Sequence, residues 1–97
     1  MKTLGTITTL SNALHTALAG RGLDRKMREQ EIFIRWPEIV GTAVANNATP
    51  TRIHRGILWI RVQDAVWRQE LSGMRMEVIR KINTALNDDI VKELRLR

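Results

Sequence analysis

The sequence contains no cysteine among its 97 residues. Disulfide bridges, cysteine nucleophiles and thiolate metal sites are therefore excluded, which fits a reducing compartment. No apolar run approaches the ~18 residues of a membrane-spanning helix, and Met1 to Thr6 lack the hydrophobic segment of a signal peptide. We therefore expect a cytoplasmic protein without membrane contact.

Residue groupings that support catalysis or cofactor binding are also missing. The two histidines, His15 and His54, are far apart and have no cysteine or carboxylate cluster beside them, which argues against a zinc or two-metal site. No glycine-rich phosphate-binding motif is present, which argues against ATP binding. The sequence predicts a protein that is not an enzyme and uses no cofactor, metal ion or small-molecule substrate.

Acidic residues are outnumbered by basic ones. Sixteen Lys and Arg against ten Asp and Glu give a formal net charge of +6. A high net positive charge favours contact with nucleic acid but does not establish it, since many small basic domains bind acidic proteins or have no particular anionic partner.

The spacing of apolar residues predicts helices first and then a mixture of strands and helices. Pro37 predicts a break at Trp36. We expect one domain over residues 1–97, with N-terminal helices in 8–45 and a strand/helix core in 51–97. The fold class is α+β, with a three-stranded sheet covered by helices on one face. The expected order α-α-β-β-α-α-β consists of helices at 8–19, 24–35 (with a short continuation at 38–45), strands at 51–55 and 57–62, helices at 65–71 and 74–86, and a strand at 90–96.

The second predicted strand separates apolar from amphipathic side chains. Because side chains alternate along a strand, Leu58, Ile60 and Val62 point to the core, and Trp59 and Arg61 point to the opposite face.

The last predicted strand adds Arg95 and Arg97 to the same face as Trp59 and Arg61. A tryptophan that stacks on a base beside arginines that hold phosphates is a recurrent single-strand binding arrangement. Alternatively, Trp59 covers the sheet with Arg61 stacked on it, or the patch is a protein interface. The sequence leaves these three interpretations open.

Four further charged residues are candidate contacts for a partner or a nucleic acid. Arg52 and Arg55 lie on the hairpin, where charges also protect a sheet edge from aggregation. Arg75 lies on the longer C-terminal helix, on a face that is more often only solvated and otherwise forms a DNA-facing ridge. Glu70 is a candidate partner contact, or an acid that stabilises the start of its helix.

The other two tryptophans are expected in the structural core. Trp67 and Leu71 are four residues apart on a short helix and therefore share a face. Trp36 precedes the proline break, where a large side chain can fill the junction.

A set of residues spread over the chain carries a family resemblance. The set comprises Trp36-Pro37-Glu38-Ile39-Val40-Gly41, Val44-Ala45, Ala48, Pro50, Gly56, Leu58, Ile60, Val62, Val66-Trp67, Gln69-Glu70-Leu71, Ile79 and Ile82-Asn83. In order and spacing it resembles the DciA family of bacterial replicative-helicase loaders.

The resemblance implies a KH-like domain that binds the replicative DNA helicase, assists its loading at replication origins, contacts single-stranded DNA and performs no catalysis. KH domains clamp nucleic acid with a Gly-x-x-Gly loop. The corresponding Leu71-Ser72-Gly73-Met74-Arg75 has a single glycine, so Arg75 is the phosphate contact left there. The alternative is a stand-alone KH-like module that binds single-stranded nucleic acid.

Overall fold

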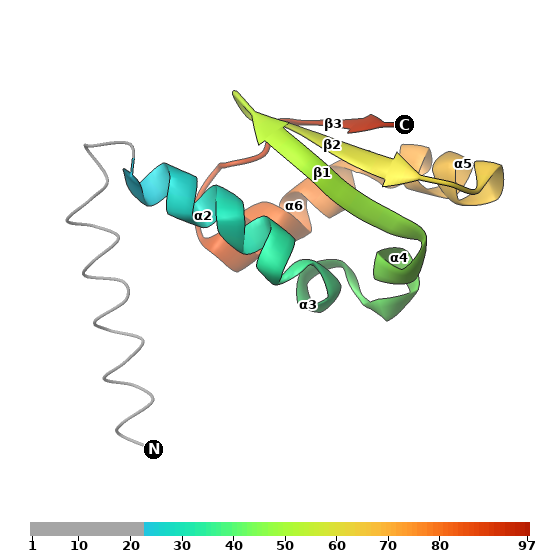
Figure 1. The fold of residues 1–97 in the computed structure, drawn as a ribbon, viewed down its shortest axis with the longest axis horizontal. Coiled ribbons are helices and arrows are strands. Elements are labelled where there is room, and N and C mark those ends of the chain that lie inside the picture. The colour runs from blue at the N-terminus through green and yellow to red at the C-terminus, as the bar shows by residue number, and fades with distance from the viewer. Residues whose placement is uncertain (1–22) are drawn as a thin grey trace, which may run out of the picture.

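The computed structural model describes residues 23–97, which form a three-stranded sheet and five helices (Figure 1). The predicted α+β class and the order of helices, two strands, two helices and a last strand are confirmed. The helix predicted at residues 8–19 lies outside the described residues. The elements are α2 (Leu23–Ile34), α3 (Trp36–Val40), α4 (Thr42–Asn47), β1 (Ala48–His54), β2 (Ile57–Val62), α5 (Ala65–Gly73), α6 (Arg75–Leu86) and β3 (Glu93–Leu96).

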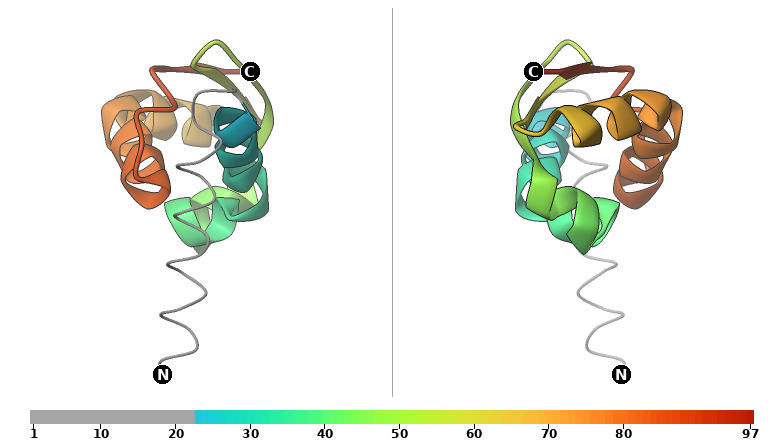
Figure 2. Two further views of the ribbon diagram at one scale, coloured as in Figure 1. Left: turned by 90° about the vertical axis from the view of Figure 1, so that its left-hand side faces the viewer. Right: turned by 90° about the vertical axis from the view of Figure 1, so that its right-hand side faces the viewer.

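The sheet has the strand order β1-β2-β3. Strands β1 and β2 are antiparallel and are joined by Arg55 and Gly56, which both have positive φ angles of 50° and 81°. Two-residue turns of this kind match the right-handed twist of the flanking strands. Strands β2 and β3 are parallel, so the chain must cross over between them, and α5 and α6 form that crossover. The helices lie together on one side of the sheet (Figure 2).

The core fills the space between the helices and the inner face of the sheet. Leu58, Ile60 and Val62 are at most 1% exposed, so the alternation predicted for β2 holds. The helices contribute the buried side chains Ile32, Trp36, Ile39, Val40, Val44, Leu71, Val78, Ile82 and Leu86. Trp67 is half-buried and packs against this cluster. The Trp36 indole Nε1 donates a hydrogen bond to the Ala48 carbonyl at 2.8 Å, which satisfies a polar group in the core.

The segment around the proline differs from the expectation in two respects. The break falls at Arg35, one residue before Trp36, and Pro37 lies in the first turn of α3, where a missing N–H costs no helical hydrogen bond. The single helix expected over residues 38–45 is two helices, because Gly41 adopts φ 94° and ψ 158°. Only glycine reaches that conformation without strain.

Arg35 links α2 to α3 across this break, because its guanidinium pairs with Glu31 of α2 at 3.6 Å and with Glu38 of α3. Arg35 donates to both carboxylate oxygens of Glu38, at 3.4 and 3.2 Å. Hydrogen bonding to Glu38 raises the pKa of Arg35 above its usual value, because the carboxylate favours the charged form of the guanidinium.

The last strand is shorter than predicted and begins at Glu93. Ile90 and Val91 are buried at 1% and 0% exposure but belong to an irregular segment. The Asn83 side chain of α6 holds that segment: its Oδ1 accepts from the Ile90 and Val91 amides at 3.1 and 2.9 Å, and its Nδ2 donates to the Val91 carbonyl at 2.8 Å. A side chain therefore replaces the strand ladder and positions the start of β3.

Candidate functional site

The face of the sheet opposite the helices carries a row of three cross-strand neighbours. Arg52 on β1 pairs with Trp59 on β2, and Trp59 pairs with Arg95 on β3. Arg61 lies further along β2, and Arg97 follows β3 with the side-chain parity of Arg95. We call the surface formed by Arg52, Trp59, Arg61, Arg95 and Arg97 the basic sheet face.

A β-bulge decides which residue lies opposite Trp59. The register shifts between Pro50 and Arg52, so Thr51 is the extra residue of β1. Without it, Thr51 and not Arg52 would oppose Trp59. The Thr51 hydroxyl donates to the Trp59 carbonyl at 3.2 Å, which compensates for the interrupted ladder. The bulge therefore brings a guanidinium over the indole.

Trp59 is 9% exposed, although it lies outside the hydrophobic core cluster. The Arg52 Cζ lies 4.2 Å from the centroid of the Trp59 ring, and the Arg95 Cζ lies 5.8 Å from it. Both distances are within the ~6 Å range of a cation–π interaction. The indole is thus covered by two arginine side chains from the neighbouring strands.

The arginines over the ring differ from the one named in one of the three open interpretations. In that interpretation Arg61 stacks on Trp59, but Arg61 is two residues further along the same strand, which is roughly 7 Å. Directly opposed residues on neighbouring strands have Cβ atoms only about 5 Å apart. Arg52 and Arg95 therefore reach the ring more easily.

The basic sheet face has little acidic compensation. Glu93 on β3 pairs with Arg95, with 2.6 Å between Oε2 and Nε. Within the part of the chain that the structure describes, neither Arg52 nor Arg61 forms an ion pair. Arginine offers five N–H donors in a planar fork that suits phosphate and carboxylate groups. This surface is therefore chemically suited to an anionic ligand.

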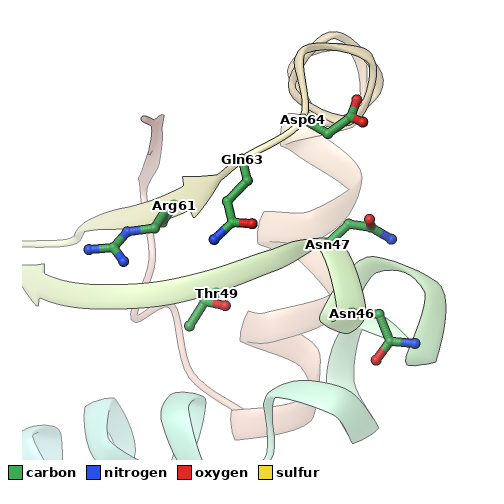
Figure 3. Close-up of a pocket in the computed structure, with 6 residues that line it drawn as sticks. All are labelled: Asn46, Asn47, Thr49, Arg61, Gln63 and Asp64. Carbon is green, nitrogen blue, oxygen red and sulfur yellow. The ribbon is translucent and has the colours of Figure 1, made fainter.

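A polar pocket of about 410 Å³ adjoins the basic sheet face, where α4 leads into β1 and β2 leaves toward α5 (Figure 3). Two of its groups are already occupied. The Asp64 carboxylate accepts from the first amides of α5, at 2.7 and 3.2 Å, and the Asn47 amide donates to the Ala43 carbonyl at 2.9 Å. The lining residues are Asn46, Asn47, Thr49, Arg61, Gln63 and Asp64.

Sequence reasoning named only Arg61 among the pocket residues as a candidate contact. Asn46, Asn47, Thr49 and Gln63 carry no functional motif. Their proximity arises from the antiparallel pairing of β1 with β2, which places Thr49 opposite Arg61.

The remaining predicted contact residues do not join this surface. Arg55 lies in the hairpin turn, Arg75 begins α6 and Glu70 is exposed on α5. The eight candidates therefore form one cluster of five residues and three separate positions.

Residues 23–97 contain no group of three His, Cys, Asp or Glu side chains arranged to hold a metal ion. In the same range, no helix has the length and apolarity needed to cross a bilayer.

Comparison with known proteins places the chain in a family. It is 35% identical over 85 residues to a UPF0232 protein of Rhodococcus jostii, covering 87% of this chain and 45% of that protein. It is 28% identical over 76 residues to a UPF0232 protein of Mycolicibacterium smegmatis, covering 78% of this chain and 39% of that protein. The chain thus spans less than half the length of these relatives. A sequence profile described as "Dna[CI] antecedent, DciA" matches residues 9–96. Since that match covers nearly the whole chain, the protein belongs to the DciA family.

Proposed function

We propose that this domain is a non-enzymatic adaptor that binds the bacterial replicative DNA helicase and assists its loading at replication origins. The observation that carries the proposal is the match to the DciA family over residues 9–96. The basic sheet face supports an accessory role in single-stranded DNA binding, because it presents several guanidinium groups on one solvent-facing surface.

In this proposal, the arginines of the basic sheet face contact phosphates. A guanidinium stacked on an indole still directs its N–H groups outward in the plane of the guanidinium. Trp59 therefore orients Arg52 and Arg95 for phosphate contact without leaving the surface. A base stacks on Trp59 only after Arg52 has moved away, because the ring is 9% exposed.

The polar pocket extends this surface beyond Arg61. Its amide and hydroxyl groups donate and accept hydrogen bonds, as the edges of nucleobases do. A strand that runs along the basic sheet face places a nucleotide at the pocket mouth, beside Arg61 and Thr49. Arg55, Arg75 and Glu70 remain predicted contacts for the helicase or for DNA.

The adaptor role is tested by titrating the purified protein with its cognate helicase in mass photometry. A complex at micromolar concentrations is expected. If no complex forms, with helicase hexamers intact in the same samples, the adaptor proposal is wrong.

The second candidate function is a stand-alone module for single-stranded nucleic acid, and the basic sheet face favours it. Fluorescence anisotropy with short labelled oligonucleotides at two salt concentrations, combined with the helicase titration, separates the two functions. DNA binding that weakens steeply with salt, together with no helicase complex, supports the module. A helicase complex that forms equally well without DNA supports the adaptor.

A further inference from the structure

Strand β3 leaves one edge of the sheet open within residues 23–97. The Arg97 amide donates to the Ile60 carbonyl at 2.9 Å, and its carbonyl accepts from the Val62 amide at 3.3 Å. In a parallel ladder, alternate residues bond to the same neighbour. The backbone groups of Leu94 and Leu96 therefore point away from β2, toward the open edge. Such an edge is a template for one more strand.

A groove of about 500 Å³ runs beside this edge, between β3 and the first turns of α6. Met76 contributes an exposed side chain, 71% accessible, and Ile79 and Leu96 are half-buried. An added strand would find hydrogen-bonding groups along β3 and an apolar wall on α6. This is the arrangement by which sheets bind extended peptides.

The rim of the groove is basic. Arg75, Lys92 and Arg95 line it, with Glu93 as the single acid. Glu93 pairs with Arg95, whereas neither Arg75 nor Lys92 has an ion-pair partner within the described part of the chain. The uncompensated cations favour an acidic ligand. They disfavour a second copy of this chain, whose net charge is also +6 and whose β3 edge would bring the same cations face to face.

We propose that the β3 edge and the α6 groove bind an extended segment of a partner protein in which apolar and acidic residues alternate. The segment joins the sheet as a fourth strand and bonds to the backbone of Leu94 and Leu96. Because side chains alternate along a strand, its apolar residues enter the groove beside Met76 and Ile79. Its acidic residues lie on the other face, toward Arg95, and acids at the ends of the segment reach toward Arg75 and Lys92 on the rim of the groove. This surface is separate from the polar pocket, and the inference does not depend on the helicase being the partner.

The test uses a fluorescent synthetic peptide of about eight residues, longer than the strand with which it pairs, in which valine and glutamate alternate. Micromolar binding by anisotropy is expected. A peptide in which lysine replaces every glutamate is the charge control and is expected to bind at least about tenfold more weakly. In amide NMR spectra, the Leu94 and Leu96 signals shift and their hydrogen exchange slows when the glutamate peptide binds.

Two pairs of variants test the geometry. Leu96→Pro removes the outward amide without breaking the ladder to β2, and Leu96→Ala truncates the same side chain but keeps the amide. Met76→Glu places an acid in the groove, and Met27→Glu makes the same change at an exposed position on α2. We expect Leu96→Pro and Met76→Glu to weaken peptide binding about tenfold relative to their controls.

Several outcomes would overturn the proposal. They are no binding of the glutamate peptide, equal binding of the lysine peptide, or equal affinities of Met76→Glu and Met27→Glu. If light scattering shows that the protein self-associates and anisotropy shows that the peptide does not bind, the edge belongs to a second copy of this chain. Circular dichroism establishes whether Leu96→Pro is folded. If Leu96→Pro is not folded, the comparison of Met76→Glu with Met27→Glu tests the proposal instead. Both methionines are exposed, so neither substitution affects the core.

Discussion

We expect Asn83 to contribute more to the free energy of unfolding than its half-exposed position suggests. Its side chain makes three hydrogen bonds to the backbone of Ile90 and Val91, and a fourth, at 3.2 Å, to the Asp89 carboxylate. Replacement by alanine removes all four at once. Ile90 and Val91 are nearly inaccessible, so water cannot easily replace the lost partners.

The expected loss follows from these contacts. A neutral hydrogen bond contributes about 1 kcal/mol net, and a buried group left without a partner costs about 1–3 kcal/mol. The bond to the exposed Asp89 counts for little, because water replaces it. The three backbone bonds then amount to a loss of about 3 kcal/mol in the free energy of unfolding. That is a large fraction of the roughly 5–15 kcal/mol of a typical domain.

Urea unfolding followed by tryptophan fluorescence measures this loss. The Asn83→Ala midpoint is expected to fall by more than about 1 M urea with little change in slope. Asn47→Ala is the matched control, because that half-exposed side chain makes a single bond, to the Ala43 carbonyl at 2.9 Å. It is expected to lose less than about 1 kcal/mol. Equal losses for the two variants would refute the idea that Asn83 holds the segment before β3.

Four other substitutions test the core, a helix cap and the basic sheet face. Trp36→Phe leaves a buried β1 carbonyl without its indole donor, so urea unfolding should record a loss of about 1–2 kcal/mol; an unchanged midpoint would contradict that role. Asp64→Ala removes the cap that accepts two amides of α5 and is expected to lower stability by about 1 kcal/mol in the same assay, whereas a loss near zero would show that the cap is dispensable. Arg52→Gln and Arg61→Gln should each weaken oligonucleotide binding and lower the slope of log affinity against log salt by about 0.7; Arg80→Gln, on an exposed face of α6, is the control, and equal slopes for all three variants would exclude the basic sheet face as the DNA contact.

The local pattern of the sequence was sufficient for much of the fold. The alternation in β2 placed Leu58, Ile60 and Val62 inward and Trp59 outward, because successive side chains of a strand point to opposite faces. The helical spacing of apolar residues likewise predicted the helix at 74–86, which the structure shows as α6 (Arg75–Leu86). These predictions succeed because they depend only on neighbours within one element.

Contacts between separate elements could not be predicted from the sequence. The bulge at Thr51 shifts the register of β1 against β2 by one residue, and the local sequence pattern does not predict it. The pairing of Arg52 with Trp59 depends on that shift, so the sequence could offer only Arg61, on the same strand, as one possible stacking partner. Similarly, Asn83 was identified as part of a family pattern, and only the fold shows that its amide holds the segment before β3.

The sequence by itself determined the fold class, the order of the described elements and the sharing of one sheet face by Trp59 and several arginines. The tertiary structure decided which arginines cover the indole, that β3 has an open edge beside α6, and that a polar pocket adjoins Arg61. The physical reason is that periodicity specifies the direction of a side chain within its own element. Strand register and layer packing specify which side chains from distant elements meet.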